Sequence, residues 1–247
     1  MLELYAHETF LALNGVIYWG NTGVLLFFLI SGFIIPATLE REASSWAFPV
    51  NRAFRILPLF YFALAAAVIA RTVVPEIQSP ELIAHPVRTI LLNLTLTHYF
   101  ANVQGVIVLS WTLCVEAFFY LVAWLLRRAG LLVRTEVLVL AGAGLLALQG
   151  TRMVVTDSRV GVYLLGWTLL FLVGTLAYRH ATGAIRGRGV GVAIAAALIL
   201  ATLTFWDYGR RSGGRLVDSG ATSVIVASAA FGICYALRER AWPTVLT

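Results

Sequence analysis

Residues 109–126 read LSWTLCVEAFFYLVAWLL. Apart from Glu116 the stretch is almost entirely apolar, and its length approaches the roughly 20 residues that a helix needs to cross the hydrocarbon core of a bilayer. A charged side chain at the centre of a membrane helix costs about 2.5–3.5 kcal/mol on insertion scales. Such a residue faces the interior of a helix bundle or a wet cavity, so Glu116 marks a candidate site.

The whole chain has the composition of a membrane protein. Of its 247 residues, 60% are hydrophobic and 12% are charged, whereas a soluble domain carries about 25% charged residues. Six or seven stretches approach the length of a membrane helix, which predicts one all-α, polytopic transmembrane bundle over residues 1–247 with about seven to eight membrane helices. The stretches are residues 21–39, 53–74, 105–126, 135–151, 160–178, 189–206 and 218–237.

Residues 88–100, RTILLNLTLTHYF, are too short and too polar to cross easily, and they predict a short or re-entrant helix. If they do not cross, 11 of the 18 arginines fall on one side of the membrane, which the positive-inside rule makes cytoplasmic. All the basic residues are arginines that lie between apolar stretches, with no basic stripe interleaved with aromatic residues. This pattern argues against a nucleic-acid partner and for the lipid bilayer.

Thr112, Glu116 and Tyr120 are spaced i, i+4, i+8, so they form a polar stripe on one face of a predicted helix. Two interpretations stay open for Glu116. It is either a structural carboxylate paired with an arginine of another helix, or a group that acts on a substrate.

Residues 20–33, GNTGVLLFFLISGF, combine small residues with an apolar helix. Small residues let helices approach closely in lipid, so packing is the simplest interpretation of the glycines. Ser31 is able to hydrogen-bond within a site, but no Gly-x-Ser-x-Gly pattern marks it as a nucleophile.

Residues 51–61, NRAFRILPLFY, place Arg52 and Arg55 three positions apart at the mouth of the next predicted span. The two arginines are either positive-inside anchors or ligands for phosphate or carboxylate, which a guanidinium grips with two parallel hydrogen bonds. Pro58 is expected in the first turn of that helix, where proline is tolerated.

His7 is a candidate general base, because histidine has an unperturbed pKa of about 6.5. Glu3, one turn earlier, is positioned to orient it if the segment is helical. The histidines in or beside loops receive no functional prediction; they are His85, His98 and His180. The cysteines lie in apolar runs without metal-ligand spacing, so no metal site is predicted.

The three blocks, in this order, resemble the acyltransferase-3 family of integral membrane proteins. The family's Gly-Val block is matched by Gly23, Val24, Phe27, Phe28, Ser31 and Gly32. Its Arg-x-x-Arg motif is matched by Arg52 and Arg55, and its Trp-Ser/Thr-Leu-x-x-Glu block by Trp111, Thr112, Leu113, Glu116, Phe119 and Tyr120. The resemblance is strongest over residues 20–126.

The resemblance implies a membrane enzyme that moves an acyl group, often acetyl, from an acyl-CoA-type co-substrate to a hydroxyl of a sugar or another acceptor, with no bound cofactor. His7 and Glu116 are the implied catalytic residues. Arg52 and Arg55 are expected to bind donor phosphates or to stabilise negative charge. The remaining implied substrate-binding residues are Ser31, Trp111, Thr112 and Tyr120. The sequence leaves acetyl and longer acyl groups open.

The family pattern also contains a histidine shortly before the Gly-Val block, which His7 matches, and an arginine about ten residues before that histidine. Members of the family usually have further helices at the C-terminal end. The chain is therefore expected to be shortened at both ends. Two other functions stay open, a glycan or lipid-linked sugar exporter and an inactive partner subunit. A chain that uses arginine and no lysine, and that is rich in alanine and glycine, suits a bacterium with a GC-rich genome. The expected location is therefore the bacterial inner membrane.

Overall fold

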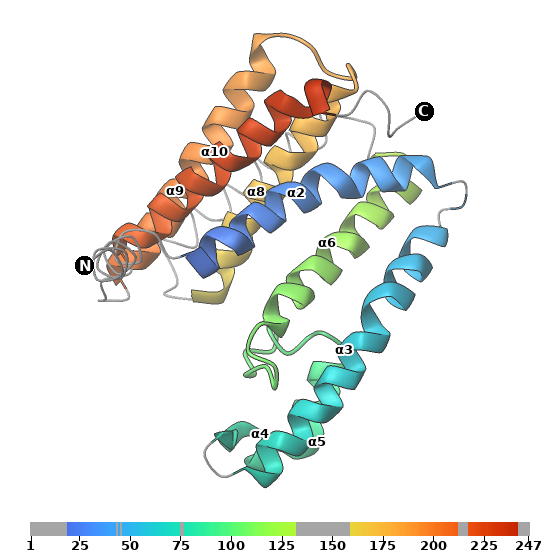
Figure 1. The fold of residues 1–247 in the computed structure, drawn as a ribbon, viewed down its shortest axis with the longest axis vertical. Helices are drawn as coiled ribbons and strands as arrows, with labels where there is room; N and C mark the ends of the chain where they lie inside the picture. The colour runs from blue at the N-terminus through green and yellow to red at the C-terminus, as the bar shows by residue number, and fades with distance from the viewer. Residues whose placement is uncertain are drawn as a thin grey trace, which may run out of the picture. The chain divides into compact units, whose positions relative to one another are not determined.

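The computed structural model describes residues 19–42, 44, 46–74, 77–131, 159–211 and 217–241. Within these residues the chain forms eight α-helices and no strand, which confirms the predicted all-α class (Figure 1). The helices are α2 (Trp19–Arg41), α3 (Ala47–Val73), α4 (Pro80–Ala84), α5 (Pro86–Leu94), α6 (Ser110–Arg128), α8 (Arg159–Ala181), α9 (Arg188–Arg211) and α10 (Val217–Ala241).

Four of the described helices are long and apolar enough to cross a membrane, namely α2, α3, α6 and the Gly220–Leu237 part of α10. The predicted number of seven to eight spans is not confirmed, and the expected span at 135–151 lies outside the described residues. The short helix expected near 88–100 is present as α5, which has nine residues and is too short to cross.

Two helix boundaries differ from the sequence prediction. Helix α3 begins at Ala47, so Pro49 occupies its first turn and Pro58 lies in its interior; the predicted first-turn position of Pro58 was wrong. An interior proline removes one backbone hydrogen bond, which membrane helices tolerate through local adjustment. Helix α6 begins at Ser110 rather than at residue 105, and the Ser110 hydroxyl donates a hydrogen bond of 2.6 Å to the carbonyl of Ile107.

The chain divides into two compact units, and the boundary falls inside α2, between Ala37 and Thr38. The four-helix unit consists of the described residues within 1–37 and 134–247, and it holds most of α2 with α8, α9 and α10. The α3–α6 unit consists of the described residues within 38–133. The prediction of a single domain stays a prediction.

In the four-helix unit, α2 and α8 approach until their backbones touch. A Cβ atom placed on Gly32 would lie 2.1 Å from the carbonyl oxygen of Phe171, and one on Gly174 would lie 2.2 Å from that of Leu29. The hydroxyl of Thr175 donates a hydrogen bond of 3.1 Å to the carbonyl of Gly32. The structure thus gives Gly32 the packing role that the sequence indicated.

In the α3–α6 unit, α3 lies beside α6, and α5 lies beside the C-terminal part of α3 (Figure 1). A small apolar core is formed by Phe60, Leu64, Leu82 and Val106. Arg71 ties the connecting loop to α3, because its Nε donates a hydrogen bond of 2.7 Å to the carbonyl of Val106. The loop between α5 and α6 is therefore held against α3.

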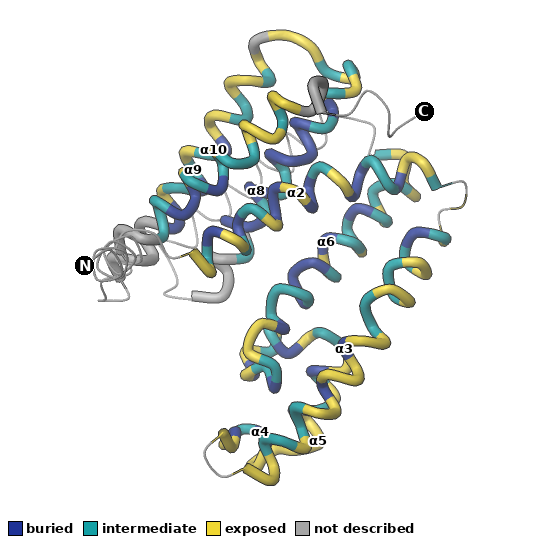
Figure 2. The backbone as a smooth tube through the Cα atoms, viewed as in Figure 1, coloured by how far each residue is buried: buried dark blue, intermediate teal, exposed yellow. Residues whose placement is uncertain are grey.

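The outer face of α3 carries large apolar side chains that the rest of its unit leaves exposed (Figure 2). They are Phe54, Leu59, Phe62, Ile69 and Val73. In a membrane protein such a face is covered by lipid, so its exposure is consistent with α3 as a membrane helix.

Candidate functional site

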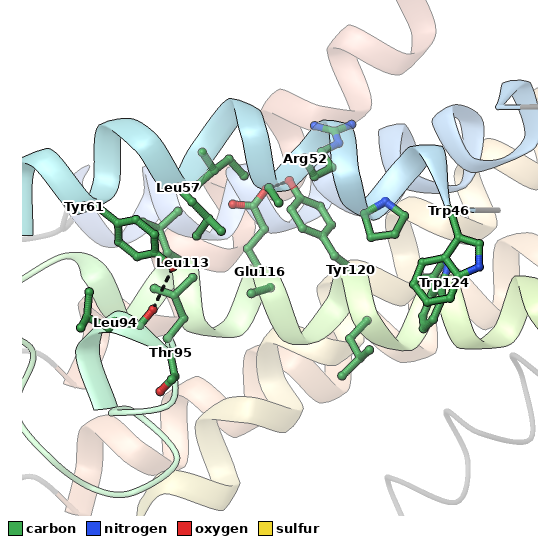
Figure 3. A pocket seen from close by; sticks show the side chains of 16 residues that line it. Trp46, Arg52, Leu57, Tyr61, Leu94, Thr95, Leu113, Glu116, Tyr120 and Trp124 are labelled. Carbon is green, nitrogen blue, oxygen red and sulfur yellow. Dashed lines mark hydrogen bonds between the residues drawn. The ribbon is translucent and has the colours of Figure 1, made fainter. Parts of the chain in front are cut away.

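A cavity of about 610 Å³ lies between α3 and α6 within the α3–α6 unit (Figure 3). Its wall from α6 has the spacing of one helical face, and consists of Leu113, Glu116, Ala117, Tyr120, Leu121 and Trp124. Its wall from α3 consists of Pro49, Arg52, Ala53, Ile56, Leu57 and Tyr61. The antiparallel course of the two helices places Trp46 beside Trp124 and Tyr61 near Leu113 (Figure 3).

Three polar side chains meet in the middle of this cavity, and we call Arg52, Glu116 and Tyr120 the polar trio. The Tyr120 hydroxyl donates a hydrogen bond to Oε1 of Glu116, one turn earlier on α6. The guanidinium carbon of Arg52 lies 5.3 Å from the centroid of the Tyr120 ring, a cation–π distance. Glu116 is only 7% exposed, and it forms no ion pair with an arginine among the described residues.

Arg52 is held in place from two further sides. Its guanidinium carbon lies 5.5 Å from the centroid of the Phe48 ring, and Nη2 donates a hydrogen bond of 3.4 Å to the hydroxyl of Thr38. The Phe48 ring itself stands edge-on to Tyr120, with centroids 5.5 Å apart. These contacts fix a cation on the α3 wall and a carboxylate on the α6 wall of the same cavity without a direct ion pair, which leaves both groups able to bind a polar ligand.

The two ends of the cavity differ in character. At the aromatic end, the rings of Trp46 and Trp124 lie 4.7 Å apart, and the guanidinium carbon of Arg128 lies 5.4 Å and 5.5 Å from their centroids. The opposite end, which we call the apolar arm, is bounded by Ile56, Leu57, Tyr61, Leu94, Leu96 and Leu113. A ligand in the cavity therefore meets the rings of two tryptophans at one end and hydrocarbon at the other.

Three predicted site residues near the polar trio do not line the cavity. Arg55 is exposed on α3, and Trp111 is half-buried, with its ring 6.2 Å from that of Tyr99. The hydroxyl of Thr112 donates a hydrogen bond of 2.8 Å to the carbonyl of Leu109. Of the predicted stripe, the structure thus brings Glu116 and Tyr120 together in the cavity and turns the Thr112 hydroxyl to its own backbone.

Two further predicted residues are not among the described residues of this unit. Ser31 is 8% exposed, belongs to the four-helix unit and is not among the residues that line the cavity. His7 lies outside the described residues. The roles assigned to both residues stay predictions.

Arg127 has a structural role that the sequence did not reveal. Its guanidinium donates hydrogen bonds to the carbonyls of Leu39 and Glu42, at the C-terminal end of α2. The last carbonyls of a helix have no partner within it, and a cation there is favourable to the helix dipole. An arginine that the sequence counted only toward topology is therefore a helix cap.

His98 is a second buried polar centre that the sequence analysis passed over. It is 1% exposed, its Nε2 lies 3.1 Å from the Ser110 hydroxyl, and its Nδ1 lies 3.4 Å from the sulfur of Cys114. Burial lowers the pKa of His98 below its ordinary value of 6.5, although a backbone hydrogen bond with Leu92 opposes this effect. The neutral imidazole thus joins the α5–α6 loop to the first turns of α6.

No periodic spacing connects these three residues, which lie on a loop and two turns of a helix. Their meeting depends on the loop path, and a Cβ atom on Gly105 would lie 2.7 Å from the Ser110 Oγ and 3.0 Å from the His98 Nε2. Glycine is therefore required for the loop to pass this close. The cluster explains how α6, and with it Glu116, is fixed at its N-terminal end.

Comparison with known proteins gives one match. The family model described as an acyltransferase domain, of the acyltransferase-3 type, matches residues 2–244, which is nearly the whole chain. Neither the search of curated proteins nor that of solved structures found a match. The matched range contains all three sequence blocks and the cavity.

Proposed function

We propose, since the chain belongs to the acyltransferase-3 family of membrane acyltransferases, that it transfers an acyl group from an acyl-CoA-type thioester to a hydroxyl of a sugar or a similar acceptor. The observation that carries this proposal is the polar trio. A carboxylate, a phenol and a guanidinium converge on a cavity of about 610 Å³ between two helices that are apolar enough to cross a membrane. Intramembrane charges of this kind mark functional sites.

In the proposed reaction His7 is the general base. It takes the proton of the acceptor hydroxyl while that oxygen attacks the thioester carbonyl, and a tetrahedral oxyanion forms. The attack forms the new carbon–oxygen bond; collapse of the intermediate then re-forms the carbonyl and breaks the carbon–sulfur bond. The proton then passes from the imidazolium to the leaving thiolate, so the products are the acylated acceptor and a free thiol.

Arg52 is proposed to stabilise the charge that develops on the carbonyl oxygen, or to bind a phosphate of the donor. Its support by Phe48, Tyr120 and Thr38 favours this role, because catalysis by charge stabilisation requires a donor that is already in place. Arg55, exposed on the same helix, is assigned to the outer phosphates of the carrier.

Glu116 is proposed to orient His7 or to hold the acceptor hydroxyl. Its hydrogen bond with Tyr120 fixes the carboxyl group through Oε1, which leaves acceptor capacity for a second donor. The acceptor is proposed to contact the aromatic rings of Tyr120 and Trp111, with the hydroxyl of Ser31 as a further polar contact. The proposed location is the inner membrane of a bacterium.

The test is transfer of a radiolabelled acyl group from acyl-CoA by the purified chain in proteoliposomes, with native lipid and glycan extracts as acceptors. We expect a labelled ester with the unaltered chain, and a loss of at least about 100-fold for His7→Ala and for Glu116→Gln. Transfer that is unchanged in both variants would contradict the assignment of these residues.

A flux assay on the same vesicles separates the enzyme from an exporter. Movement of a glycan across the bilayer without covalent change would favour transport. A folded chain that neither transfers nor transports would favour the partner-subunit interpretation. Leu59→Ala is the matched control, because Leu59 is 73% exposed on the outer face of α3 and does not line the cavity.

A further inference from the structure

We propose that the acyl chain of the donor is longer than acetyl and lies in the apolar arm of the cavity, where Leu57 and Leu96 limit its length. The inference rests on the proposed function, because it concerns the donor of that same reaction. It is carried by the chemistry of the arm, by the order of groups along the cavity and by the backbone at Leu96.

The apolar arm offers a ligand few polar groups among its described residues, and the two hydroxyls at its edge already donate their protons to backbone carbonyls. The Tyr61 hydroxyl donates a hydrogen bond of 3.3 Å to the carbonyl of Leu94 (Figure 3). The hydroxyl of Thr95, at the rim, donates one of 2.9 Å to the carbonyl of Leu91. A sugar placed here would lose more hydrogen bonds with water than the arm could replace, whereas a hydrocarbon chain loses none.

The order of groups along the cavity matches the order of groups in an acyl-CoA-type donor. Such a donor consists of an anionic carrier, a thioester and a hydrocarbon chain. The cavity runs from the aromatic end, whose Trp46 and Trp124 rings contact Arg128, through the polar trio, to the apolar arm. A thioester carbonyl at the polar trio therefore directs the carrier toward the aromatic end and the chain into the arm.

The size of the arm fits a chain rather than a methyl group. Along α3 the cavity extends from Arg52 to Tyr61, and at a rise of about 1.5 Å per residue these positions are roughly 13 Å apart. The whole cavity, at about 610 Å³, has the volume of a pocket for a drug-sized molecule. Acetyl would leave most of the arm empty.

The wall of the arm at Leu96 is held in an unusual backbone conformation. Leu96 has a φ of +54°, in the left-handed region that leucine rarely adopts. The surroundings impose it: the Leu96 amide donates a hydrogen bond of 3.1 Å to the carbonyl of Asn93, and Asn93 is itself buried and accepts one of 3.0 Å from the Val106 amide. A strained residue kept at a cavity wall points to a role in shaping the ligand.

The experiment compares acetyl-CoA, octanoyl-CoA and palmitoyl-CoA as donors for the full chain in proteoliposomes, with kcat/KM for each. We expect octanoyl transfer to exceed acetyl transfer by about tenfold or more, because even one additional methylene buried in an apolar pocket is worth about tenfold. Leu57→Trp fills the arm and is expected to lower the octanoyl-to-acetyl ratio by about tenfold or more.

A second variant tests the arm independently, in case Leu57→Trp does not fold. Leu96→Gly removes part of the wall and adopts a positive φ without strain, so it is expected to shift the preferred donor toward palmitoyl. Leu59→Trp is the control, since the same change on the 73% exposed outer face of α3 is expected to leave the donor ratios unaltered.

Transfer confined to acetyl would overturn the inference and leave the proposed function standing. Donor ratios of kcat/KM that neither Leu57→Trp nor Leu96→Gly changes would also overturn the inference and leave the proposed function standing. That result would mean that bilayer lipid occupies the arm. Transfer from no donor, by a chain that remains folded, would overturn the proposed function and the inference with it.

Discussion

The helix pairs α2–α8 and α3–α6 are both built from apolar stretches, yet the first forms a packing interface and the second borders a cavity. Between α2 and α8, Gly32 and Gly174 bring backbone against backbone. Between α3 and α6, tryptophan, tyrosine, leucine and arginine side chains hold the helices apart around about 610 Å³. The size of the facing side chains, rather than their hydropathy, thus separates a structural contact from a site.

The largest expected effect is the loss of acyl-transfer activity when the cation of the cavity is removed. Arg52→Gln removes the cation from the polar trio and is expected to lower kcat/KM for acyl transfer by about 100-fold, as loss of a positioned charge-stabilising group does. Arg55→Gln is the matched variant, because Arg55 is exposed and does not line the cavity; we expect a loss of less than about tenfold. Equal losses would contradict the distinction between the two arginines.

The next largest effect is a loss of stability when the close contact between α2 and α8 is disturbed. Gly32→Ala places a Cβ atom against the backbone of α8 and is expected to destabilise the folded chain by about 1–3 kcal/mol in a detergent unfolding titration. Gly23→Ala is the control on the same helix, where nothing lies within 4 Å of the new atom. It is expected to stabilise the helix by up to about 1 kcal/mol. Destabilisation by both variants to the same extent would rule out close packing as the cause.

A smaller effect is expected from the hydroxyl that supports Glu116. Tyr120→Phe deletes the hydrogen bond to the carboxylate and keeps the ring under Arg52. We expect a loss of about tenfold in kcat/KM, since a hydrogen bond to a charged group is worth about 1.5–3 kcal/mol. Thr112→Val, which removes a hydroxyl bonded only to the carbonyl of Leu109 in the described part of the chain, is expected to change the rate by less than about twofold.

The smallest effect concerns pH. The folded chain lowers the pKa of His98 below 6.5, so the unfolded chain binds the proton more readily. The stability of the native state is therefore complete above pH 6.5 and falls as the pH drops from that value through the lower pKa of the folded chain. Unfolding titrations at about pH 7.5 and about pH 5.5 are expected to show this loss in the unaltered chain and a smaller loss in His98→Gln. An equal loss in both would show that other groups dominate the acid response.

Much of the fold was predictable, because membrane helices follow from apolar length alone. The starts of α3 and α6 were not predicted correctly. For α3, the sequence offers two prolines near one helix start. Pro49 takes the first turn and Pro58 the interior. Hydropathy does not distinguish these positions, because both lie in an apolar run.

The site was predictable in part. The i, i+4 spacing of Glu116 and Tyr120 fixes their common face, whatever packs against it. Whether Arg52 or Arg55 lines the cavity depends on which face of α3 packs against α6. The sequence does not give this rotation of α3 about its own axis. The cluster around His98 could not be predicted, because it depends on the path of a loop. In that loop Leu96 and Asn102 have positive φ, which their residue types do not indicate.

The most direct test of the account is protection of a cysteine placed inside the cavity. Ala117 lines the cavity beside Glu116, whereas Leu125 is 50% exposed on α6 and does not line it. Cys114 is buried and Cys234 is exposed, so the background is Cys234→Ala. The account predicts that acyl-CoA slows labelling of Ala117→Cys by a membrane-permeant thiol reagent and leaves labelling of Leu125→Cys unchanged. Equal labelling of Ala117→Cys with and without saturating acyl-CoA would contradict the claim that the donor binds between α3 and α6.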